Sequence, residues 1–292
     1  MKRLRSPIIW VGGKGNMVAK LLKLIPPHKI YVEPFGGGAS LLFAKEPSPV
    51  EVYNDIDSNI VNFFRVLRDP EKFEKFYRKV CLTPFSREEY YYCRDTWDKC
   101  EDEIERAYRW YIVARWSFSG IFGRSWSFAI TKSSKNMAST CSRWLSIIDM
   151  LPQIHERLMR VQIEHNDFRK IFETYDTPDT LFYCDPPYVL EAKKDVLYQY
   201  ELTLKDHKDL VDILLNIKGK AILSCYYHPV YDRLIEAGWK RIDFETASYT
   251  VGKTRFTGII GKNSAREKAK RIETVLLSFD LDQNNGKLFD IT

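Results

Sequence analysis

The chain has 292 residues, 45% of them hydrophobic and 14% aromatic, enough for one large domain or a domain with an insertion. No apolar run approaches the roughly 20 residues that span a bilayer, and the basic N-terminus lacks the apolar stretch of a signal peptide. Six cysteines occur without a C-x-x-C pair or a histidine at zinc spacing, so we expect reduced thiols in a cytoplasmic protein and no metal site.

The first third of the chain alternates predicted strands and helices. Residues 30–35 predict a strand that runs into three glycines, after which a helix is expected from about residue 39. Residues 50–54 predict a second strand that ends at Asp55, and residues 60–67 predict a helix. This order is typical of the beginning of a doubly wound α/β sheet.

The character of the sequence changes at about residue 68. Residues 69–105 carry mixed charges with helical periodicity, and residues 125–142 are rich in Ser and Thr and predict a loop or hairpin. Residues 106–148 contain seven basic residues and no acidic one, which exceeds the net charge of the whole chain, +6. Aromatic residues are interleaved with these basic residues. The combination favours a nucleic acid partner over a solvated helix face.

Strands and helices alternate again after residue 146. Strands are predicted over 161–164, 181–184, 221–225 and 274–279, with helices from residue 168 and over 203–217. We therefore predict an α/β fold in which residues 1–67 and 147–292 form a doubly wound, Rossmann-like sheet. Residues 68–146 are predicted to be an inserted, mainly helical domain.

The segment Glu33-Pro34-Phe35-Gly36-Gly37-Gly38-Ala39-Ser40 places glycines where the first strand turns into a helix, and glycine lets the backbone approach a ligand closely. Asp55 ends the next strand, where nucleotide-binding sheets place an acid that accepts hydrogen bonds from ribose. The motif is not G-x-G-x-x-G, and Glu33 would lie near a pyrophosphate. A cationic adenosine cofactor such as S-adenosylmethionine is therefore favoured over NAD. A redox enzyme and a purely structural turn remain alternatives at this point.

The segment Trp10-Val11-Gly12-Gly13-Lys14 combines a large aromatic residue, two glycines and a lysine just before a predicted helix. We interpret it as a wall for the cofactor, with Lys14 holding the cofactor carboxylate. An N-terminal turn with a core tryptophan is the alternative.

The tetrapeptide Asp185-Pro186-Pro187-Tyr188 follows an apolar run, residues 181–184. Its two prolines fix φ and remove two N–H donors, so a carboxylate and carbonyl oxygens stand beside an aromatic ring at the end of a strand. This arrangement can accept both hydrogens of a planar amino group and stack on the ring that carries it. A plain strand-terminating turn is the alternative.

These motifs, together with Asn166-Asp167-Phe168 and a closing segment over 268–279, resemble the N6-adenine DNA methyltransferases of the DNA adenine methylase type. They occur in that family's order across nearly the whole chain. The resemblance implies a methyltransferase fold that transfers a methyl group from S-adenosylmethionine to N6 of an adenine flipped out of the duplex. Cytosine-N4 enzymes usually carry Ser where this chain has Asp185, which favours adenine.

The resemblance also implies two sets of site residues. In the catalytic set, Asp185 and the carbonyl of Pro186 accept the amine hydrogens, Tyr188 stacks on the adenine, and Pro187 completes the turn. The cofactor-binding set consists of Trp10, Gly12, Lys14, Glu33, Phe35, Gly36, Gly38, Ser40, Asp55, Asp167, Phe168 and Asp185.

The family's target-recognition domain lies where composition places the insertion. The residues expected to hold phosphates or read guanine edges are Arg115, Arg124, Lys132, Lys135 and Arg143. A second phosphate-contacting face is one interpretation of Arg255, Lys262 and Lys270, and solvated side chains are the alternative. The segment Phe118-Ser119-Gly120 with Phe122 only loosely resembles the recognition hairpin of GATC methylases, so no target sequence is predicted.

Double-stranded DNA is the expected partner, bound by a monomer that is not attached to a membrane. A nucleoid-associated protein of a prokaryote or phage is implied, and a cognate restriction endonuclease is a further candidate partner. The alternatives are a methyltransferase that acts on RNA or on a protein glutamine, and a catalytically silent DNA-binding relative. The basic insertion argues against the first, and the intact Asp55, Asp185 and Tyr188 argue against the second.

Overall fold

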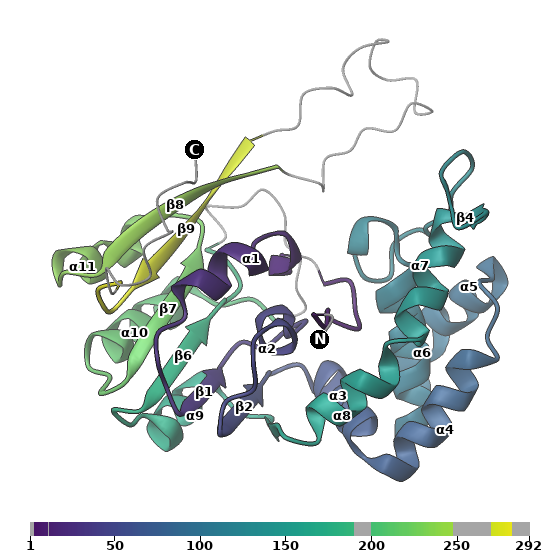
Figure 1. The fold of residues 1–292 in the computed structure, drawn as a ribbon, viewed down its shortest axis with the longest axis horizontal. Helices are drawn as coiled ribbons and strands as arrows, with labels where there is room; N and C mark the ends of the chain where they lie inside the picture. The colour runs from purple at the N-terminus through teal and green to yellow at the C-terminus, as the bar shows by residue number, and fades with distance from the viewer. Residues whose placement is uncertain (1–2, 11, 190–199, 248–269, 282–292) are drawn as a thin grey trace.

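The structure is a computed structural model that describes residues 3–10, 12–189, 200–247 and 270–281. A twisted sheet with helices packed on it occupies one part of the molecule, and helices formed by residues 70–148 stand beside it (Figure 1). No helix in these described ranges is long and apolar enough to cross a membrane.

The main sheet has seven strands in the order β5-β2-β1-β6-β7-β9-β8. In chain order they are β1 (Ile30–Glu33), β2 (Val50–Asn54), β5 (Gln162–Glu164), β6 (Thr180–Cys184), β7 (Lys220–Cys225), β8 (Lys240–Ala247) and β9 (Lys270–Leu277). The first five strands in the spatial order pair in parallel, whereas β9 pairs antiparallel with both β7 and β8. The strand order reverses between β1 and β6, so the ends of these two strands form the topological switch point at which α/β sheets bind ligands.

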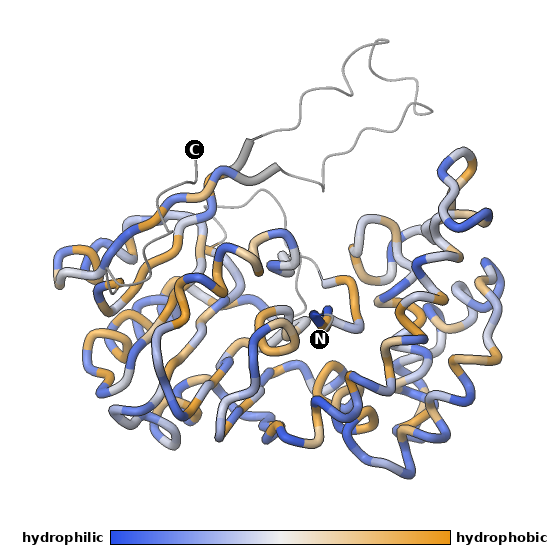
Figure 2. Tube along the Cα trace, viewed as in Figure 1, coloured by the Kyte–Doolittle hydropathy of each residue, from blue (hydrophilic) through white to orange (hydrophobic). Residues whose placement is uncertain are grey.

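Both faces of the sheet are covered, which explains why its central strands are mostly apolar. Tyr31 and Tyr183 point to one face and belong to the larger hydrophobic core, whereas Val32 and Phe182 point to the other face and belong to a second core. In Figure 2 hydrophobic and hydrophilic stretches alternate along the strands and helices, as expected for elements with one buried face.

The helices on the two faces come from different parts of the chain. The larger core contains residues of α1 (Val18–Leu21), α2 (Ser40–Ala44), α3 (Ser58–Arg68) and α8 (Leu151–Leu158). The second core contains residues of α9 (Phe168–Tyr175), α10 (Leu204–Leu215) and α11 (Asp232–Glu236). Short 3-10 turns are η1 (Lys14–Asn16), η2 (Leu22–Leu24), η3 (Trp97–Lys99), η4 (Phe118–Gly120) and η6 (Pro229–Tyr231).

The insertion is mainly helical, as predicted. It contains α4 (Pro70–Cys81), α5 (Arg87–Thr96), α6 (Glu103–Trp116) and α7 (Ser139–Ile148), with a hairpin of β3 (Ser133–Ser134) and β4 (Met137–Ala138). Helix α6 is buried on most of its circumference and stacks Tyr111 on Phe63 of α3, with ring centroids 5.1 Å apart. One continuous core therefore joins the insertion to the sheet, and the boundary at residues 68 and 146 remains a prediction.

Several predicted boundaries are off by one or two residues, for example that of β1, and three elements differ more from their predicted form. Helix α7 begins inside the predicted Ser/Thr-rich loop, because Thr140, Trp144 and Ile148 recur every four residues and are all buried. Strand β9 covers 270–277 rather than 274–279. Strand β8 was not predicted: it is an edge strand with alternating charged residues, which weakens the apolar signal.

Candidate active site

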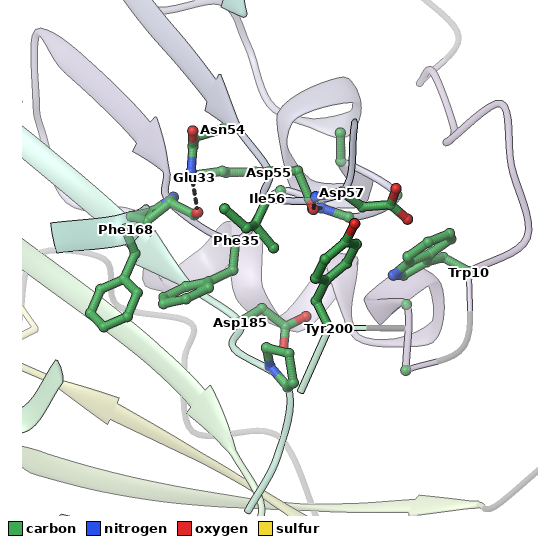
Figure 3. Close-up of a pocket in the computed structure, with 18 of the residues that line it drawn as sticks. Trp10, Glu33, Phe35, Asn54, Asp55, Ile56, Asp57, Phe168, Asp185 and Tyr200 are labelled. Atoms are coloured by element: carbon green, nitrogen blue, oxygen red, sulfur yellow. Dashed lines mark hydrogen bonds between the residues drawn. The ribbon is translucent and has the colours of Figure 1, made fainter. Parts of the chain in front are cut away.

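Three neighbouring strands end at one edge of the sheet with polar residues. Glu33 is the last residue of β1, Asp55 follows β2, and Asp185 follows β6. Because β1 and β6 flank the switch point and β2 pairs with β1, these three carboxyl groups lie around one site. Figure 3 shows the three side chains at this edge.

The glycine segment between β1 and α2 is shaped by close contacts that exclude side chains. A Cβ atom on Gly36 would overlap the ring of Tyr53, and Gly37 has φ of +46°. The backbone is held in place because Gly36 N–H donates to Asn54 O at 2.7 Å and Tyr53 Oη donates to Gly37 O at 2.9 Å. The turn is therefore fixed before any ligand arrives.

The carboxyl group of Asp55 is held by backbone donors. Gly37 N–H donates to Oδ2 at 2.7 Å and Asp57 N–H donates to Oδ1 at 2.9 Å. Burial raises the pKa of Asp55 to about 6, although these two hydrogen bonds oppose the effect. A carboxylate has about four lone-pair sites, so Asp55 can still accept hydrogen bonds from a ligand.

Two phenylalanines form one end of the site. The rings of Phe35 and Phe168 lie 5.2 Å apart between centroids, and both appear at the same end in Figure 3. Asn54 joins their segments, since its Nδ2 donates to Pro34 O at 2.9 Å and its Oδ1 accepts from Asn166 N–H at 2.9 Å. Because the hydrogen bonds involve the backbone, they fix the distance between the two rings.

Asp167 stands beside this aromatic pair and begins α9 as its N-cap. Its Oδ1 accepts from Arg169 N–H at 2.9 Å, and its carboxylate pairs with the Arg169 guanidinium at 3.0 Å. Arg169 also binds Asp206 and Asp209 of α10, each at 2.6 Å. This cluster ties the start of α9 to the start of α10 at the rim of the site.

Lys14 lies against the tetrapeptide. Its Nζ donates to Asp185 Oδ1 at 2.7 Å, to Tyr188 Oη at 2.5 Å and to Gly12 O at 3.1 Å. Burial raises the pKa of Asp185 to about 6, with Lys14 opposing the effect. An ammonium group has three donors, and the protein itself takes all three here. The expected contact of Lys14 with a cofactor carboxylate therefore remains a prediction.

Glu33 is 2% exposed and is held by neutral donors. Tyr31 Oη donates to Glu33 Oε1 at 2.7 Å and Leu42 N–H donates to the same oxygen at 3.0 Å. Burial raises the pKa of Glu33 to about 8. Among the described residues Glu33 makes no ion pair, so this acid favours a ligand that carries positive charge.

These features line one pocket of about 620 Å³. All of the predicted cofactor-binding residues contribute to its lining, as does Pro187, whereas Pro186 and Tyr188 do not. Figure 3 shows Phe35 and Phe168 at one end, Trp10 at the other, and Asp185 with Tyr200 between them. The folded chain thus brings residues from widely separated sequence segments, from residue 9 to residue 206, into a single cavity.

Comparison with known proteins identifies the kind of enzyme. Residues 10–250 match the model of the D12 class N6 adenine-specific DNA methyltransferases. The chain belongs to this family. The match favours the adenine-DNA interpretation over the RNA, protein and redox alternatives.

Similar individual proteins carry related names. The type II methyltransferase M1.LlaDCHI of Lactococcus lactis subsp. cremoris is 27% identical over 289 residues, covering 92% of this chain and 94% of the relative. A DNA adenine methylase of Vibrio cholerae is 23% identical, covering 73% of this chain and 76% of the relative. The DNA N-6-adenine-methyltransferase of Escherichia phage P1 is 22% identical, covering 72% of this chain and 28% of the relative.

This adenine-specific DNA methyltransferase has a second pocket, of about 250 Å³, on the insertion side. Arg115 and Arg143 line it, with aromatic walls from Phe85, Trp116 and Trp144. Nε of Arg115 is buried and has no hydrogen-bond partner in the described chain. Burial, with the nearby cations of Arg143 and Arg5, lowers the pKa of Arg115. The pocket therefore favours an anion.

The remaining predicted DNA-contacting residues are exposed. Arg124 follows η4, and Lys132 and Lys135 lie at the β3–β4 hairpin, where Lys135 and Asn136 have positive φ as in a tight hairpin turn. None of the five predicted DNA-contacting residues makes an ion pair within the part of the chain that the structure describes. The predicted contacts of Arg255 and Lys262, and of the side chain of Lys270, lie outside the described residues.

Several site residues were missed by the sequence analysis. Trp110 and Phe122 of the insertion and Tyr200 line the larger pocket. Glu273 of β9 accepts a hydrogen bond from Tyr188 Oη at 2.6 Å, and the ring of Tyr226 lies 4.4 Å from that of Tyr188. Apart from Phe122, which the sequence analysis compared only with a DNA-recognition hairpin, none of these residues belongs to a spaced motif. Only the closing segment pointed to the strand that carries Glu273.

Proposed function

We propose that the chain takes the methyl group from S-adenosylmethionine, held in the larger pocket, and transfers it to an adenine flipped out of duplex DNA. Phe35 and Phe168 would flank the cofactor adenine, with Asp167 beside it, and Asp55 would accept hydrogen bonds from the ribose. When bound, S-adenosylmethionine supplies a methyl group on a sulfonium. The observation that carries the proposal is the buried carboxyl group of Glu33, which has neutral hydrogen-bond donors but no ion pair within the described residues.

The residues present fit this cofactor. Glu33, Asp55 and Asp185 are acids at one edge of the pocket, and burial raises the pKa of each. Such acids favour a ligand with a sulfonium, an ammonium and hydroxyl donors. A pyrophosphate would instead meet three carboxyl groups, which argues against NAD.

Asp185 would activate the amine of the target base. The adenine amine is a poor nucleophile because its lone pair is delocalised into the ring. A carboxylate and the carbonyl of Pro186 that accept its hydrogens would localise the lone pair and offset the positive charge that develops on nitrogen. Tyr188 would stack on the base, and alignment of amine and methyl group would supply much of the acceleration.

The insertion would deliver the DNA. Its exposed cations would contact phosphates, and base flipping would cost roughly a few kcal/mol that these contacts offset. We propose a monomer on DNA. The type II names of two relatives, from Lactococcus lactis and from a chlorella virus, support a restriction endonuclease as a partner.

The proposal is tested by calorimetry with S-adenosylmethionine and by methyl transfer to duplex DNA. Asp55→Ala is expected to weaken cofactor binding by about tenfold or more, because a hydrogen bond to a charged group contributes about 1.5–3 kcal/mol. Asp185→Asn is expected to bind the cofactor but transfer no methyl group. Expression of the unaltered chain in a methylation-free host, followed by single-molecule sequencing, identifies the methylated adenines.

Three outcomes would contradict the proposal. Unchanged cofactor affinity in Asp55→Ala removes the ribose contact. Methyl transfer retained by Asp185→Asn removes the assigned role of that carboxylate. A wild-type chain that binds no S-adenosylmethionine refutes the choice of cofactor.

A further inference from the structure

Glu273 reaches the active site from a strand that runs against the others. Parallel strands present their carboxyl ends to the site, and β9 is antiparallel to β7, with Thr274 paired to Cys225 at the end of β7. The beginning of β9 therefore lies at the same edge as the end of β6. This topology brings Glu273 next to residues that are 85 or more positions away in sequence.

A chain of polar contacts connects Glu273 to the catalytic carboxylate. Tyr188 Oη donates to Glu273 Oε2 at 2.6 Å, and Lys14 Nζ donates to Tyr188 Oη at 2.5 Å. Lys14 Nζ then lies 2.7 Å from Asp185 Oδ1 and 3.9 Å from Glu273 Oε2. Lys14 and Glu273 are 5% and 9% exposed, so little solvent screens these charges.

Glu273, the second acid beside Lys14, helps to keep this buried lysine protonated. Burial alone lowers the pKa of Lys14, but Asp185 and then Glu273 outweigh this effect and raise it above its ordinary value. With Glu273 neutral, Lys14 would depend on Asp185 alone, and Tyr188 would lose its charged acceptor. The hydroxyl of Tyr188 and the ammonium of Lys14 would then both lack the carboxylate of Glu273, which helps to orient them beside Asp185.

We propose that Glu273 is a positioning residue for methyl transfer, which through Tyr188 and Lys14 holds the Asp185 carboxylate in its working orientation. The inference rests on the proposed role of Asp185. Glu273 itself touches neither reactant in this arrangement. Its removal is expected to impair the chemical step more than cofactor binding, because the pocket lining does not include it.

The pH dependence of the reaction separates this role from a structural one. Asp185 must be ionised to accept the amine hydrogen, so the rate falls as the pH drops through its pKa, about 6. The ionisable groups that influence or contact Asp185 and its neighbours are Lys14, Glu33, Tyr183, Cys184, Tyr188, Cys225, Tyr226 and Glu273. Among them Glu273 raises the pKa of Asp185, so loss of its charge shifts the fall to lower pH.

The test compares Glu273→Gln with Glu245→Gln, an exchange of an exposed acid on the neighbouring strand β8. Both variants are measured in single-turnover methyl transfer over a range of pH. Glu273→Gln is expected to be about 10- to 100-fold slower near neutral pH. The acidic limb of its pH profile, the range in which the rate falls as the pH drops, is expected at lower pH than in the wild type. Its affinity for S-adenosylmethionine is expected to be unchanged. Glu245→Gln is expected to match the wild type. Glu273→Asp keeps the charge and is expected to restore the position of the limb, which supplies a second variant should Glu273→Gln not fold.

A wild-type rate in Glu273→Gln overturns the proposal. So does a slower rate with an unmoved acidic limb, because a purely structural defect lowers the rate equally at every pH. Asp185→Asn, measured in parallel, keeps the two proposals apart. If that variant still transfers methyl groups, the proposed role of Asp185 fails. If it is inactive while Glu273→Gln is normal, only the role of Glu273 fails.

Discussion

Glu33 shows why an active-site acid can be costly to the folded chain. Its carboxyl group is buried beneath the glycine turn and accepts hydrogen bonds from Tyr31 and from the backbone of Leu42. Burial raises its pKa to about 8, so the folded chain keeps a proton that the unfolded chain releases near pH 4.5. Between about pH 4.5 and 8 the unfolded state therefore binds fewer protons, and stability falls as the pH rises.

Glu33→Gln is expected to remove this decline. The free energy of unfolding, measured in urea from pH 5 to 8, should fall less in the variant than in the wild type, by at least about 1.4 kcal/mol, the equivalent of one pKa unit. The exposed Glu46→Gln is the matched control and should follow the wild type. Parallel pH profiles of Glu33→Gln and wild type would show that Glu33 is ionised in the folded chain.

Cofactor binding offers an independent measurement at the same residue. If a cation binds beside Glu33, the carboxyl group loses its proton, because an adjacent positive charge lowers its pKa. Calorimetry near pH 7 in buffers with different ionisation enthalpies should detect this proton release in the wild type and not in Glu33→Gln. Equal proton release in both would assign the proton to another group.

Helix α6, a single element, both packs into the core and carries a cation for binding. Most of its length is buried between the other helices of the insertion and α3, where Trp110 and Tyr111 contribute to the core. Near its carboxyl end it carries Arg115, whose charge no acid in the described chain balances. A cation in this position is unfavourable for folding and favourable for binding a polyanion.

Arg115→Met is expected to separate these two effects. The substitution keeps an unbranched side chain and should raise the free energy of unfolding by about 1 kcal/mol, because it removes a half-buried charge that no acid in the described chain balances. The same variant should bind duplex DNA more weakly, with the slope of log K against log salt reduced by about 0.9 for one lost phosphate contact.

Arg94→Met serves as the control, because Arg94 of the same insertion already pairs with Asp95 at 2.7 Å. Its salt slope should equal that of the wild type. A salt slope that Arg115→Met leaves unchanged would remove Arg115 from the phosphate contacts.

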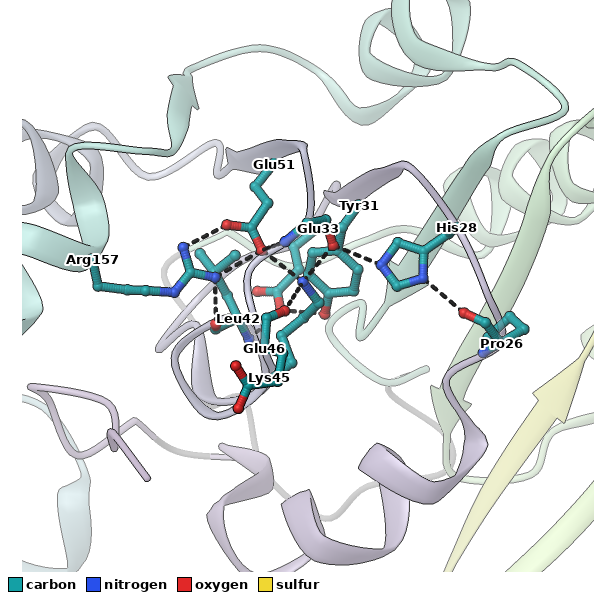
Figure 4. Close-up of polar contacts among 10 residues, drawn as sticks. Pro26, His28, Tyr31, Glu33, Leu42, Lys45, Glu46, Glu51 and Arg157 are labelled. Atoms are coloured by element: carbon teal, nitrogen blue, oxygen red, sulfur yellow. Dashed lines mark hydrogen bonds and ion pairs between the residues drawn. The ribbon is translucent and has the colours of Figure 1, made fainter. Parts of the chain in front are cut away.

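At the scale of the whole molecule, a buried ionic network joins α8, the helix that follows the insertion, to the sheet. Arg157 of α8 pairs with Glu51 of β2 at 2.5 Å, and Lys45 pairs with the same carboxylate at 2.6 Å (Figure 4). Arg157 Nη2 also donates to Leu42 O at 3.0 Å, and Leu42 N–H donates to Glu33. The network thus links α8, the sheet, α2 and Glu33, an acid that lines the larger pocket.

Arg157→Met is expected to destabilise the chain by about 3 kcal/mol, because Glu51 stays buried with one cation fewer. It should also weaken cofactor binding through Leu42 and Glu33. The matched control is Arg233→Met, which breaks an exposed pair with Asp212 and should cost less than about 1 kcal/mol. Urea unfolding measures both variants, and equal losses would mean that the buried network adds nothing beyond a surface ion pair.

The sequence by itself determined the features that are local or ordered along the chain. Short runs rich in apolar residues predicted the strands β1, β2, β6 and β7, because strands buried on both faces are mostly apolar. The motifs around Gly36, Asp55 and Asp185 each end a strand, so their meeting at one sheet edge followed from the alternation of strands and helices. The acid-free stretch from residue 106 to 148 predicted the basic insertion.

Only the tertiary structure decided which distant residues meet. Glu273 reaches Tyr188 because β9 runs antiparallel beside β7, and no spacing in the sequence encodes that direction. Arg115 lies in a pocket because α6 and α7 pack against each other through Trp116 and Trp144, with ring centroids 5.0 Å apart. Local patterns determine which side chains a strand or helix presents. Packing between elements determines which other side chains these contact. The charged groups among those contacts set the pKa values on which the chemistry depends.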